Sequence, residues 1–498
     1  MTALGAIFIL LSAITSGLVF NAIRQWYRLS HIPGPFSTGF SQIWMARQAL
    51  LGRQPMALKE ANDKYGSLIR VGPNDVITDD PSVLRRMNGV RSAYDRGPWY
   101  DSMRFDGGKD SIVSVRGAYH DKLRYKMAGA YSGKESEAIE ANVDLHVSKF
   151  IQLIENKYIS TSDVFRPMDF AQKAQYFTLD VISDLAFSHA FGYLEADDDL
   201  YDYVKLTRAY IPVMVTFANI PSLARMIQSP IFRGLLPKST DKLGFGAFMG
   251  IVTKVVAKRL GPLAESKPDM LGSFMRHGLT DEEAPREGLV QVLAGSDSSA
   301  TTIRYILLYL LATPTAYNRL QREIDEGIAA GTISSPVRNT EARDLPYLQA
   351  VIREGLRIRP PASGAFFKTV PPGGDTINGK FLPGGTQLGS SSFSIHHSKR
   401  VFGEDAESFI PERWLTAEPG RLAEMTSTAD LVFHSGKWQC LGKPVALMEF
   451  NKMFVELLRR YNFSLVNPEK PATTKNAGIW VVEDFWVRVT RRETVESH

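Results

Sequence analysis

Three stretches of the chain repeat their hydrophobic positions at helical spacing. Gly288 to Ala312 is long and largely apolar, with polar residues gathered at its centre, and Thr313-Pro314 ends it. Leu345 to Arg357 and Lys443 to Tyr461 are shorter amphipathic stretches. We therefore predict three helices, the longest of which crosses the core while presenting polar groups halfway along its length.

Turn-rich segments toward the carboxyl end predict short strands. Glycines and a proline interrupt Thr376 to Leu388, and Ile479 to Val489 alternates apolar with other residues, which predicts a closing hairpin. The chain contains no internal repeat and no low-complexity segment. The expected fold class is mainly α with small β-sheets.

The amino terminus has the pattern of a membrane anchor. Thr2 to Ile23 carries no charged residue and would span roughly 33 Å as a helix, enough to cross one bilayer. Arginines follow at once and none precedes, so the positive-inside rule places the rest of the chain in the cytosol. A cleaved signal peptide is the alternative, but it lacks the usual basic start. We predict a transmembrane anchor at 1–23, a basic and Pro-rich hinge at 24–36 and one large domain at 37–498.

Composition and charge exclude several classes of protein. Of the 498 residues, 44% are hydrophobic and 10% aromatic, which excludes disorder for the bulk of the chain. A net charge of +5 suits an anionic membrane surface or an acidic partner and is too small for nucleic-acid binding. Cys440 is the single cysteine, so an internal disulfide and a zinc site built from several thiolates are both excluded.

The segment around that cysteine has the pattern F-x-x-G-x-x-x-C-x-G, carried by Phe433, Gly436, Cys440 and Gly442. Gly436 permits a tight turn, and Gly442 permits the close approach of a large flat group. Cys440 lies just before a predicted helix, whose N–H groups and dipole favour a thiolate. The pattern indicates an axial ligand to iron, with a buried structural cysteine as the alternative.

This loop resembles the haem-thiolate loop of the cytochrome P450 family, and further motifs occur in the family's order. Glu354 and Arg357 match its E-x-x-R motif, and residues 409–414 resemble its P-E-R-F/W motif through Arg413. The resemblance implies a cytochrome P450 fold and a haem b whose iron is ligated by Cys440. It also implies that Glu354, Arg357 and Arg413 form a buried triad that stabilises the loop beneath the haem.

The polar centre of the longest predicted helix carries a third motif. Residues 294–298, Ala-Gly-Ser-Asp-Ser, resemble the family's A/G-G-x-D/E-T. The resemblance implies that Gly295 lets the helix open and that Asp297 and Ser298 are the catalytic acid–alcohol pair that delivers protons. Serine replaces the usual threonine, which keeps the hydroxyl but leaves its orientation less constrained. The alternative is a serine that bonds back to the carbonyl four residues earlier.

The resemblance also implies cations for the two haem propionates. His120 and Arg124 match the family's H-x-x-x-R, and Lys368 lies where a propionate-binding arginine often occurs. Trp438 departs from the pattern, because many members place another such arginine there. Propionate binding is therefore expected to fall on His120, Arg124 and Lys368.

Softer motifs and family position suggest the kind of substrate. Residues 94–100, Tyr-Asp-Arg-Gly-Pro-Trp-Tyr, are similar to fungal microsomal members of the pisatin-demethylase type. An apolar, medium-sized substrate is expected, because the walls would be aliphatic and aromatic. The candidate lining residues are Phe105, Ile112, Val113, Ala294, Ala365, Phe366 and Ile479.

The resemblance implies a monooxygenase that inserts one atom of O2 into an apolar small molecule, in fungal secondary metabolism. Electrons would come from NADPH through a separate NADPH–cytochrome P450 reductase, and cytochrome b5 is a further partner that the resemblance allows. Lys122, Lys126, Lys437 and Lys443 would meet the reductase's acidic face, with plain surface solvation as the alternative. The expected location is the endoplasmic reticulum membrane, crossed once, with the catalytic domain cytosolic.

Two other classes of protein remain open. One is a haem-thiolate isomerase or dehydratase that acts without a reductase, and the other is a non-enzymatic haem-binding membrane protein. The Asp297–Ser298 pair argues against both, because neither needs proton delivery to oxygen.

Overall fold

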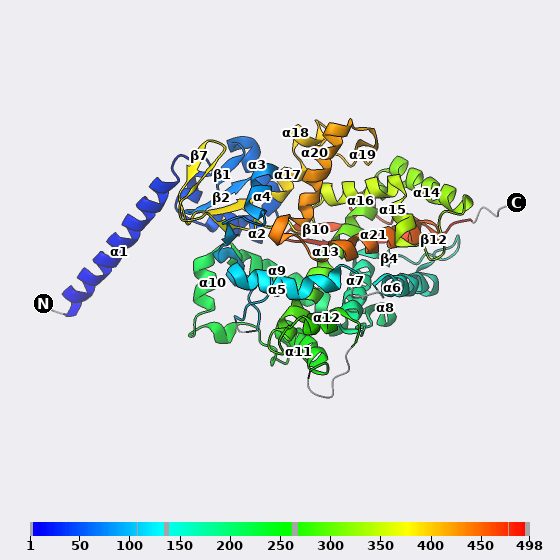
Figure 1. The fold of residues 1–498 in the computed structure, drawn as a ribbon, viewed down its shortest axis with the longest axis horizontal. Helices are drawn as coiled ribbons and strands as arrows, with labels where there is room; N and C mark the ends of the chain where they lie inside the picture. The colour runs from blue at the N-terminus through cyan, green and yellow to red at the C-terminus, as the bar shows by residue number, and fades with distance from the viewer. Residues whose placement is uncertain (1–2, 107, 134–138, 261–266, 477, 494–498) are drawn as a thin grey trace.

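Helices make up most of the molecule, and the strands form small sheets beside them (Figure 1). The computed structural model describes residues 3–106, 108–133, 139–260, 267–476 and 478–493. The helices are α1 (Ala3–Arg28), α2 (Ile43–Leu50), α3 (Gln54–Tyr65), α4 (Pro81–Asn88), α5 (Gly117–Tyr131), α6 (Ile139–Leu153), α7 (Phe170–Phe187), α8 (Tyr193–Ala196), α9 (Tyr203–Ala218), α10 (Pro221–Ile227), α11 (Gly244–Ala257), α12 (Met270–Arg276), α13 (Ala284–Ala312), α14 (Pro314–Ala329), α15 (Asn339–Arg343), α16 (Pro346–Ile358), α17 (Ser392–His396), α18 (Lys399–Phe402), α19 (Arg413–Thr416), α20 (Pro419–Ala429) and α21 (Lys443–Leu458). The strands are β1 (Leu68–Arg70), β2 (Asp75–Thr78), β3 (Asp95–Arg96), β4 (Met168–Asp169), β5 (Lys368–Thr369), β6 (Asp375–Ile377), β7 (Lys380–Leu382), β8 (Gln387–Ser390), β9 (Tyr461–Leu465), β10 (Thr473–Asn476), β11 (Trp480–Glu483) and β12 (Trp486–Arg491).

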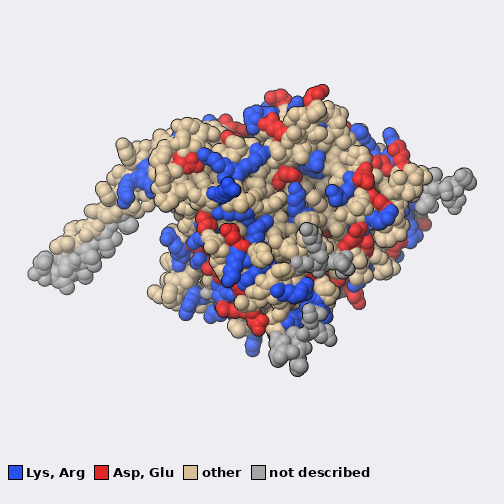
Figure 2. Space-filling view, viewed as in Figure 1, with Lys and Arg blue, Asp and Glu red and all other residues tan. Residues whose placement is uncertain are grey.

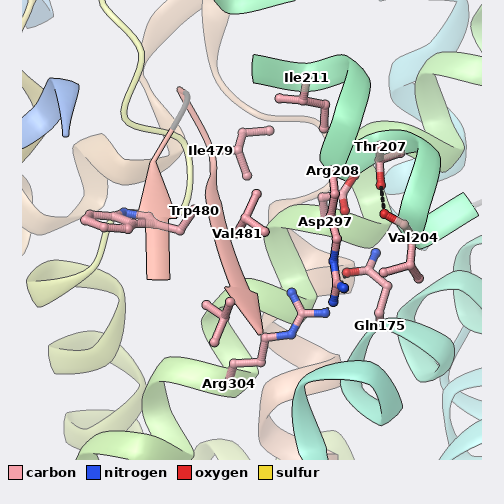
Figure 3. Close-up of a pocket in the computed structure, with 11 residues that line it drawn as sticks. Gln175, Val204, Thr207, Arg208, Ile211, Asp297, Arg304, Ile479, Trp480 and Val481 are labelled. Carbon is pink, nitrogen blue, oxygen red and sulfur yellow. Dashed lines mark hydrogen bonds between the residues drawn. The ribbon is translucent and has the colours of Figure 1, made fainter. Parts of the chain in front are cut away.

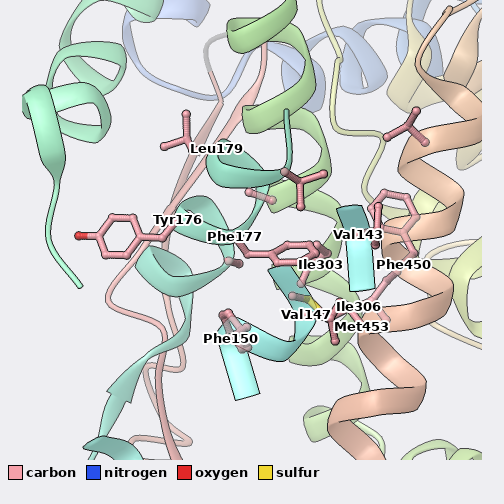
Figure 4. Close-up of a cluster of buried hydrophobic side chains, with 14 of the residues drawn as sticks. Val143, Val147, Phe150, Tyr176, Phe177, Leu179, Ile303, Ile306, Phe450 and Met453 are labelled. Carbon is pink, nitrogen blue, oxygen red and sulfur yellow. The ribbon is translucent and has the colours of Figure 1, made fainter. Parts of the chain in front are cut away.

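The long helix α13 runs through the centre of the body and packs against α7 along its length (Figure 1). Phe177 of α7, Ile303 of α13 and Phe450 of α21 meet in one hydrophobic cluster and are almost fully buried (Figure 4). Burying side chains of this size contributes about 1.5–3 kcal/mol each. The three predicted helices are confirmed as α13, α16 and α21, and the mainly α fold class is confirmed with them.

A five-stranded sheet brings distant parts of the chain together. Its strand order is β1-β2-β8-β5-β3, with β2 and β8 parallel and the other neighbours antiparallel. In the β3–β5 ladder, Arg96 lies opposite Lys368, which places two cations side by side.

The predicted closing hairpin at Ile479 to Val489 is wrong. β11 pairs with β10, whereas β12 pairs with β4 and β9 in a different sheet. Asp484, between the two strands, has a φ of 56°, which turns the chain from one sheet to the other. The alternating pattern marked two strands correctly but carried no information about their partners.

Helix α1 projects from the body and continues past the predicted anchor to Arg28, so the start of the predicted hinge is helical (Figure 1). The guanidinium of Arg70 donates hydrogen bonds to the carbonyls of Gln25 and Trp26, both at 3.0 Å. Leu29 and Ile32 are buried in the small core under β1 and β2. The hinge is therefore bound to the body along its length.

By length and apolar composition, no single helix among the described residues suffices to span a membrane. The segment Leu200–Ala218, which contains α9, reaches that length and composition only together with α10, and the two are bent by 115° relative to each other.

Candidate functional site

The cysteine loop is held in a tight backbone conformation. The N–H of Cys440 donates to the carbonyl of Phe433 at 2.8 Å, which closes the loop just before α21. Gly436 has a φ of 58°, and a Cβ there would lie 2.0 Å from the carbonyl oxygen of Asn88. Only glycine satisfies both conditions. A Cβ on Gly442 would have the sulfur of Cys440 as its only near neighbour, at 3.9 Å.

Cys440 lies at an exposed position just before α21. Solvent reaches the side chain, yet protein surrounds it on most sides, and this desolvation raises the pKa of the thiol. The backbone N–H groups of Gly442 and Lys443 and the charge of Arg124 oppose that rise. A bound metal cation would stabilise the thiolate outright, so the chemistry of this site suits ligation of iron.

A cluster of cations surrounds Trp438, two residues before the cysteine. The guanidinium carbon of Arg96 lies 4.5 Å from the centre of the indole and the ammonium of Lys368 lies 4.7 Å from it. The ring of His120 is 4.2 Å from the indole. Lys437 follows at 5.2 Å. We call Arg96, Lys368, Lys437 and their neighbour Trp438 the cation cluster.

The negative charge of Asp95 acts on the cation cluster, but it does not offset the effect of burial on Lys368. Lys368 is 3% exposed, and burial together with the charges of Arg96 and Lys437 lowers its pKa to about 6. Its ammonium donates to the amide oxygen of Asn88. Burial and Arg96 also lower the pKa of His120 to about 4. An anion placed here would relieve the repulsion, as buried cations are normally paired.

Two buried donors of the cluster have no partner among the described residues, namely Nε of Arg96 and Nε1 of Trp438. Both belong to groups that bind carboxylates well. Arg124, nearer the cysteine, donates to the carbonyl of Gln439 at 2.7 Å. The residues present therefore fit a haem, with a sulfur for the iron and unpaired donors for the propionates.

Arg96 is the residue of this site that the sequence analysis missed. Its segment was recognised as a similarity motif, but Arg96 itself received no role. The signal was there, because Arg96 is the one basic residue within a short aromatic segment, residues 94–100.

The triad residues are in contact and buried. Arg357 donates to both oxygens of Glu354, at 2.8 and 2.7 Å, and Arg413 donates to one of them at 3.0 Å. The arginines also donate to carbonyls between residues 396 and 408. In the described chain these hydrogen bonds do not reach the cysteine loop, so the triad stabilises the segment after α16 and acts on the loop only through it.

At the centre of α13, Asp297 and Ser298 point to different partners. Asp297 accepts a hydrogen bond from the hydroxyl of Tyr203 at 3.0 Å, and burial raises the pKa of its carboxyl to about 6. The hydroxyl of Ser298 donates to the carbonyl of Ala294 at 2.8 Å. This is the back-bonded arrangement of the alternative interpretation.

Helix α13 is continuous through Gly295, so the expected opening of the helix does not occur in this structure. A Cβ at Gly295 would lie 2.7 Å from a side-chain carbon of Ile182 on α7. The glycine is therefore explained by the close packing of α7 against α13.

A hollow of about 360 Å³, part of it open solvent, reaches Asp297 from the side (Figure 3). It admits a water-sized molecule and lies between α7, α9, α13 and β11. Arg208, at its rim, forms an ion pair with Glu483 at 3.0 Å. Asp297 therefore lines a hollow that is partly open to solvent, among both polar and apolar side chains.

Of the candidate substrate residues, Ile479 lines this hollow together with Asp297. Phe105 and Ala365 are buried in hydrophobic clusters, whereas Ile112, Val113 and Phe366 are partly buried and Ala294 is exposed. The described pockets do not bring these residues together in one cavity.

Four lysines were expected on the surface that meets a partner, and for Lys126 this expectation is wrong. Lys126 is buried and forms an ion pair with Glu283 at 2.8 Å, so it cannot meet another protein. Lys122 is exposed, while Lys437 and Lys443 are partly exposed.

The fold and this site define a haem-thiolate protein. A family model described as Cytochrome P450 matches residues 35–483. The chain belongs to the cytochrome P450 family, and the family implies a haem iron with a cysteine thiolate ligand, for which Cys440 is the single cysteine of the chain.

Named relatives of high coverage are fungal enzymes. The chain is 42% identical to the cytochrome P450 monooxygenase ABA1 of Pyricularia oryzae, over 97% of this chain and 96% of that protein. It is 40% identical to aba1 of Botryotinia fuckeliana, over 94% and 93%, and 37% identical to abl1 of Leptosphaeria maculans, over 91% and 82%. The expectation of a P450 monooxygenase, an oxidoreductase, is confirmed at the level of class.

Proposed function

We propose that this protein inserts one atom of O2 into an apolar small molecule of fungal secondary metabolism. The observation that carries the proposal is the pairing of one exposed cysteine, Cys440, with a cation cluster that has unpaired donors. When bound, the haem supplies activation of O2, with the thiolate donating electron density to iron. The monooxygenase names of the relatives favour this class over an isomerase or a non-enzymatic haem protein.

The chain's own groups have separate tasks in this proposal. Arg96, His120, Arg124, Lys368 and the indole N–H of Trp438 hold the propionates. Phe433, Gly436 and Gly442 shape the loop that presents the sulfur.

Proton delivery falls to α13. The carboxyl of Asp297 takes protons from the solvent-connected hollow, and the hydroxyl of Tyr203 holds its Oδ2. Ser298 would take a proton from this carboxyl and donate its own hydroxyl proton toward the bound O2 substrate, once the hydroxyl has turned away from the carbonyl of Ala294. Replacing Asp297 by Asn keeps the shape and removes the acid. We expect product formation to fall by about 10²–10⁴-fold.

The assay has two stages. A reduced, CO-bound spectrum of the full chain at the long-wavelength position of thiolate haem tests ligation. NADPH and O2 consumption with added reductase then separates a monooxygenase from an isomerase, which would act without either. Metabolite profiling after deletion of the gene in its host identifies the substrate, and an unchanged profile with no NADPH use would contradict the proposal.

We also propose that α1 attaches the protein to the endoplasmic reticulum membrane, with the body in the cytosol. Residues 2–23 are uncharged, and in Figure 2 the visible part of α1 carries basic residues only near the body. Phe8, Val19 and Phe20 are exposed along it. The test is alkaline carbonate extraction of the full chain beside a chain lacking residues 2–20. The proposal fails if both stay in the soluble fraction.

The electron donor in this proposal is a membrane-bound NADPH–cytochrome P450 reductase, with cytochrome b5 as a second donor. Lys122, Lys437 and Lys443 give the thiolate side of the body a basic character that suits an acidic partner. Raising the ionic strength should slow reductase-supported turnover and leave peroxide-supported turnover unchanged. If salt affects both equally, these lysines do not dock the reductase.

A further inference from the structure

One backbone N–H in the loop before α5 donates hydrogen bonds to a buried carboxyl group. Residues 111–115 form one tight turn, closed by hydrogen bonds from the N–H groups of Ser114 and Val115 to the carbonyl of Ser111. The N–H of Ile112, at the top of this turn, donates to both carboxyl oxygens of Glu287, at 3.0 and 3.2 Å. Glu287 belongs to the first turns of α13, so the loop is fixed to the central helix.

The next peptide group of the turn is also hydrogen-bonded. The carbonyl of Ile112 accepts a hydrogen bond from the guanidinium of Arg96, which also donates to the carbonyl of Val115 at 3.0 Å. Arg96 is a member of the cation cluster around Trp438. One guanidinium therefore joins this loop to the cation cluster.

Burial of the Glu287 carboxyl costs desolvation free energy. It is 1% exposed, and burial raises the pKa of its carboxyl to about 8. The charges nearest to it are Arg286, Arg96 and Glu283, and the last of these is itself bound by Lys126 and Tyr119. A packed apolar side chain would avoid the desolvation of the carboxyl. What the carboxyl provides in return is two acceptors for one loop N–H.

We infer that Glu287 is a positioning residue that fixes the turn of residues 111–115, and with it Ile112 and Val113, relative to α13 and the haem site. Ile112 and Val113 are partly buried aliphatic side chains on this turn. A small movement of the turn would change which substrates fit, so Glu287 acts on specificity through Ile112 and touches no substrate itself. The effect on substrates rests on the proposed function, whereas the positioning of the turn rests on its hydrogen bonds alone.

Hydrogen exchange of the full-length, haem-loaded protein tests the hydrogen bonds between the Ile112 N–H and Glu287. Glu287→Leu removes both acceptors and should speed exchange of the Ile112 amide about tenfold or more, since this N–H loses the carboxyl that accepts its hydrogen bond. Glu287→Gln keeps one acceptor and should stay close to the wild-type rate. Glu283→Gln, on the same end of α13 but not bonded to Ile112, is the matched control and should leave this amide unchanged.

The affinity for 4-phenylimidazole, an azole that binds haem iron, tests the substrate side. Glu287→Leu should weaken its binding by about tenfold, because the displaced turn would no longer bury one face of the ligand's phenyl ring. Glu287→Gln should bind it as wild type does. Equal exchange rates or equal azole affinity in Glu287→Leu and wild type would overturn the inference.

Should Glu287→Leu fail to fold, the wild-type protein decides the matter. An Ile112 amide that exchanges as fast as an unprotected peptide overturns the inference without any variant. None of these measurements uses O2 or NADPH, so a protein that proves not to be a monooxygenase can still pass or fail them.

Discussion

Arg96 and Lys368 lie directly opposite each other in the β3–β5 ladder, and both contact the ring of Trp438. Like charges at opposite positions of a ladder are destabilising. A neutral indole in place of the arginine common in the family avoids adding a further cation to this pair. The pair is most stable when an anion lies beside it, which links the sheet to occupancy of the haem site.

Retention of haem should depend on Lys368. Lys368→Met keeps the length of the side chain and removes the charge, so we expect haem transfer to apomyoglobin to become about tenfold faster. Lys380→Met, on β7 and outside the cluster, is the control. An unchanged transfer rate in Lys368→Met would show that the lysine does not hold the propionate.

Thiolate ligation should depend entirely on Cys440. Because the chain has no second cysteine, Cys440→Ser and Cys440→Ala should both lose the long-wavelength CO spectrum and monooxygenase activity together. Circular dichroism of each variant checks that the fold persists. A retained thiolate spectrum in either variant contradicts the site.

Removal of the acid of the triad should be costly. Glu354→Leu leaves Arg357 and Arg413 buried without their carboxylate, which should lower the free energy of unfolding by about 3–5 kcal/mol. The matched control is Arg319→Gln, which breaks an exposed ion pair with Glu412 and should cost no more than about 1 kcal/mol. Urea unfolding measures both, and similar losses would mean that the triad is not special.

Stability should fall as the pH rises toward 8, in part through Glu449. This side chain is 2% exposed, burial raises its pKa to about 8, and its Oε2 has no partner among the described residues. The folded protein therefore holds a proton that the unfolded chain has released above a pH of about 4.5. Each pH unit within this window costs at most about 1.4 kcal/mol.

Glu449→Gln removes that linkage. Its melting temperature should match that of wild type near pH 5 and exceed it increasingly up to pH 8. At pH 8 the difference in the free energy of unfolding should be about 1 kcal/mol or more. Exposed Glu418→Gln should show no such trend. A difference that stays constant with pH would mean that Glu449 is charged in the folded protein.

The hydroxyl of Tyr203 should tune the acid on α13. Tyr203→Phe removes a hydrogen bond that favours the charged form of Asp297, so the pKa of this carboxyl should rise further above its usual range. The change should be about tenfold in the protonation equilibrium. Infrared titration of the carboxyl band against Asp297→Asn as reference measures it, and an unchanged band would remove Tyr203 from the proton path.

Local patterns predicted the helices and the cysteine loop well, because their chemistry lies within a few residues. α13, α16 and α21 needed only periodicity and a proline, and Gly436 needed only a turn. Partners far apart in the chain were beyond reach. Lys126 was expected on the surface because nothing nearby marks Glu283 as its partner, and Arg96 gained meaning only once β3 paired with β5.

The hydrogen bonds from Arg70 to the carbonyls of Gln25 and Trp26 determine where the chain can be shortened. A soluble version that begins at about residue 24 keeps the acceptors of this guanidinium and the buried side chains of Leu29 and Ile32. A version that begins at residue 37 removes the carbonyls of Gln25 and Trp26 and both buried side chains. It leaves the buried Arg70 with fewer acceptors, namely the carbonyls of Gly39, Gly72 and Pro73. The useful boundary for expression therefore lies inside α1, and the proline-rich segment that looks like a natural cut in the sequence belongs to the folded body.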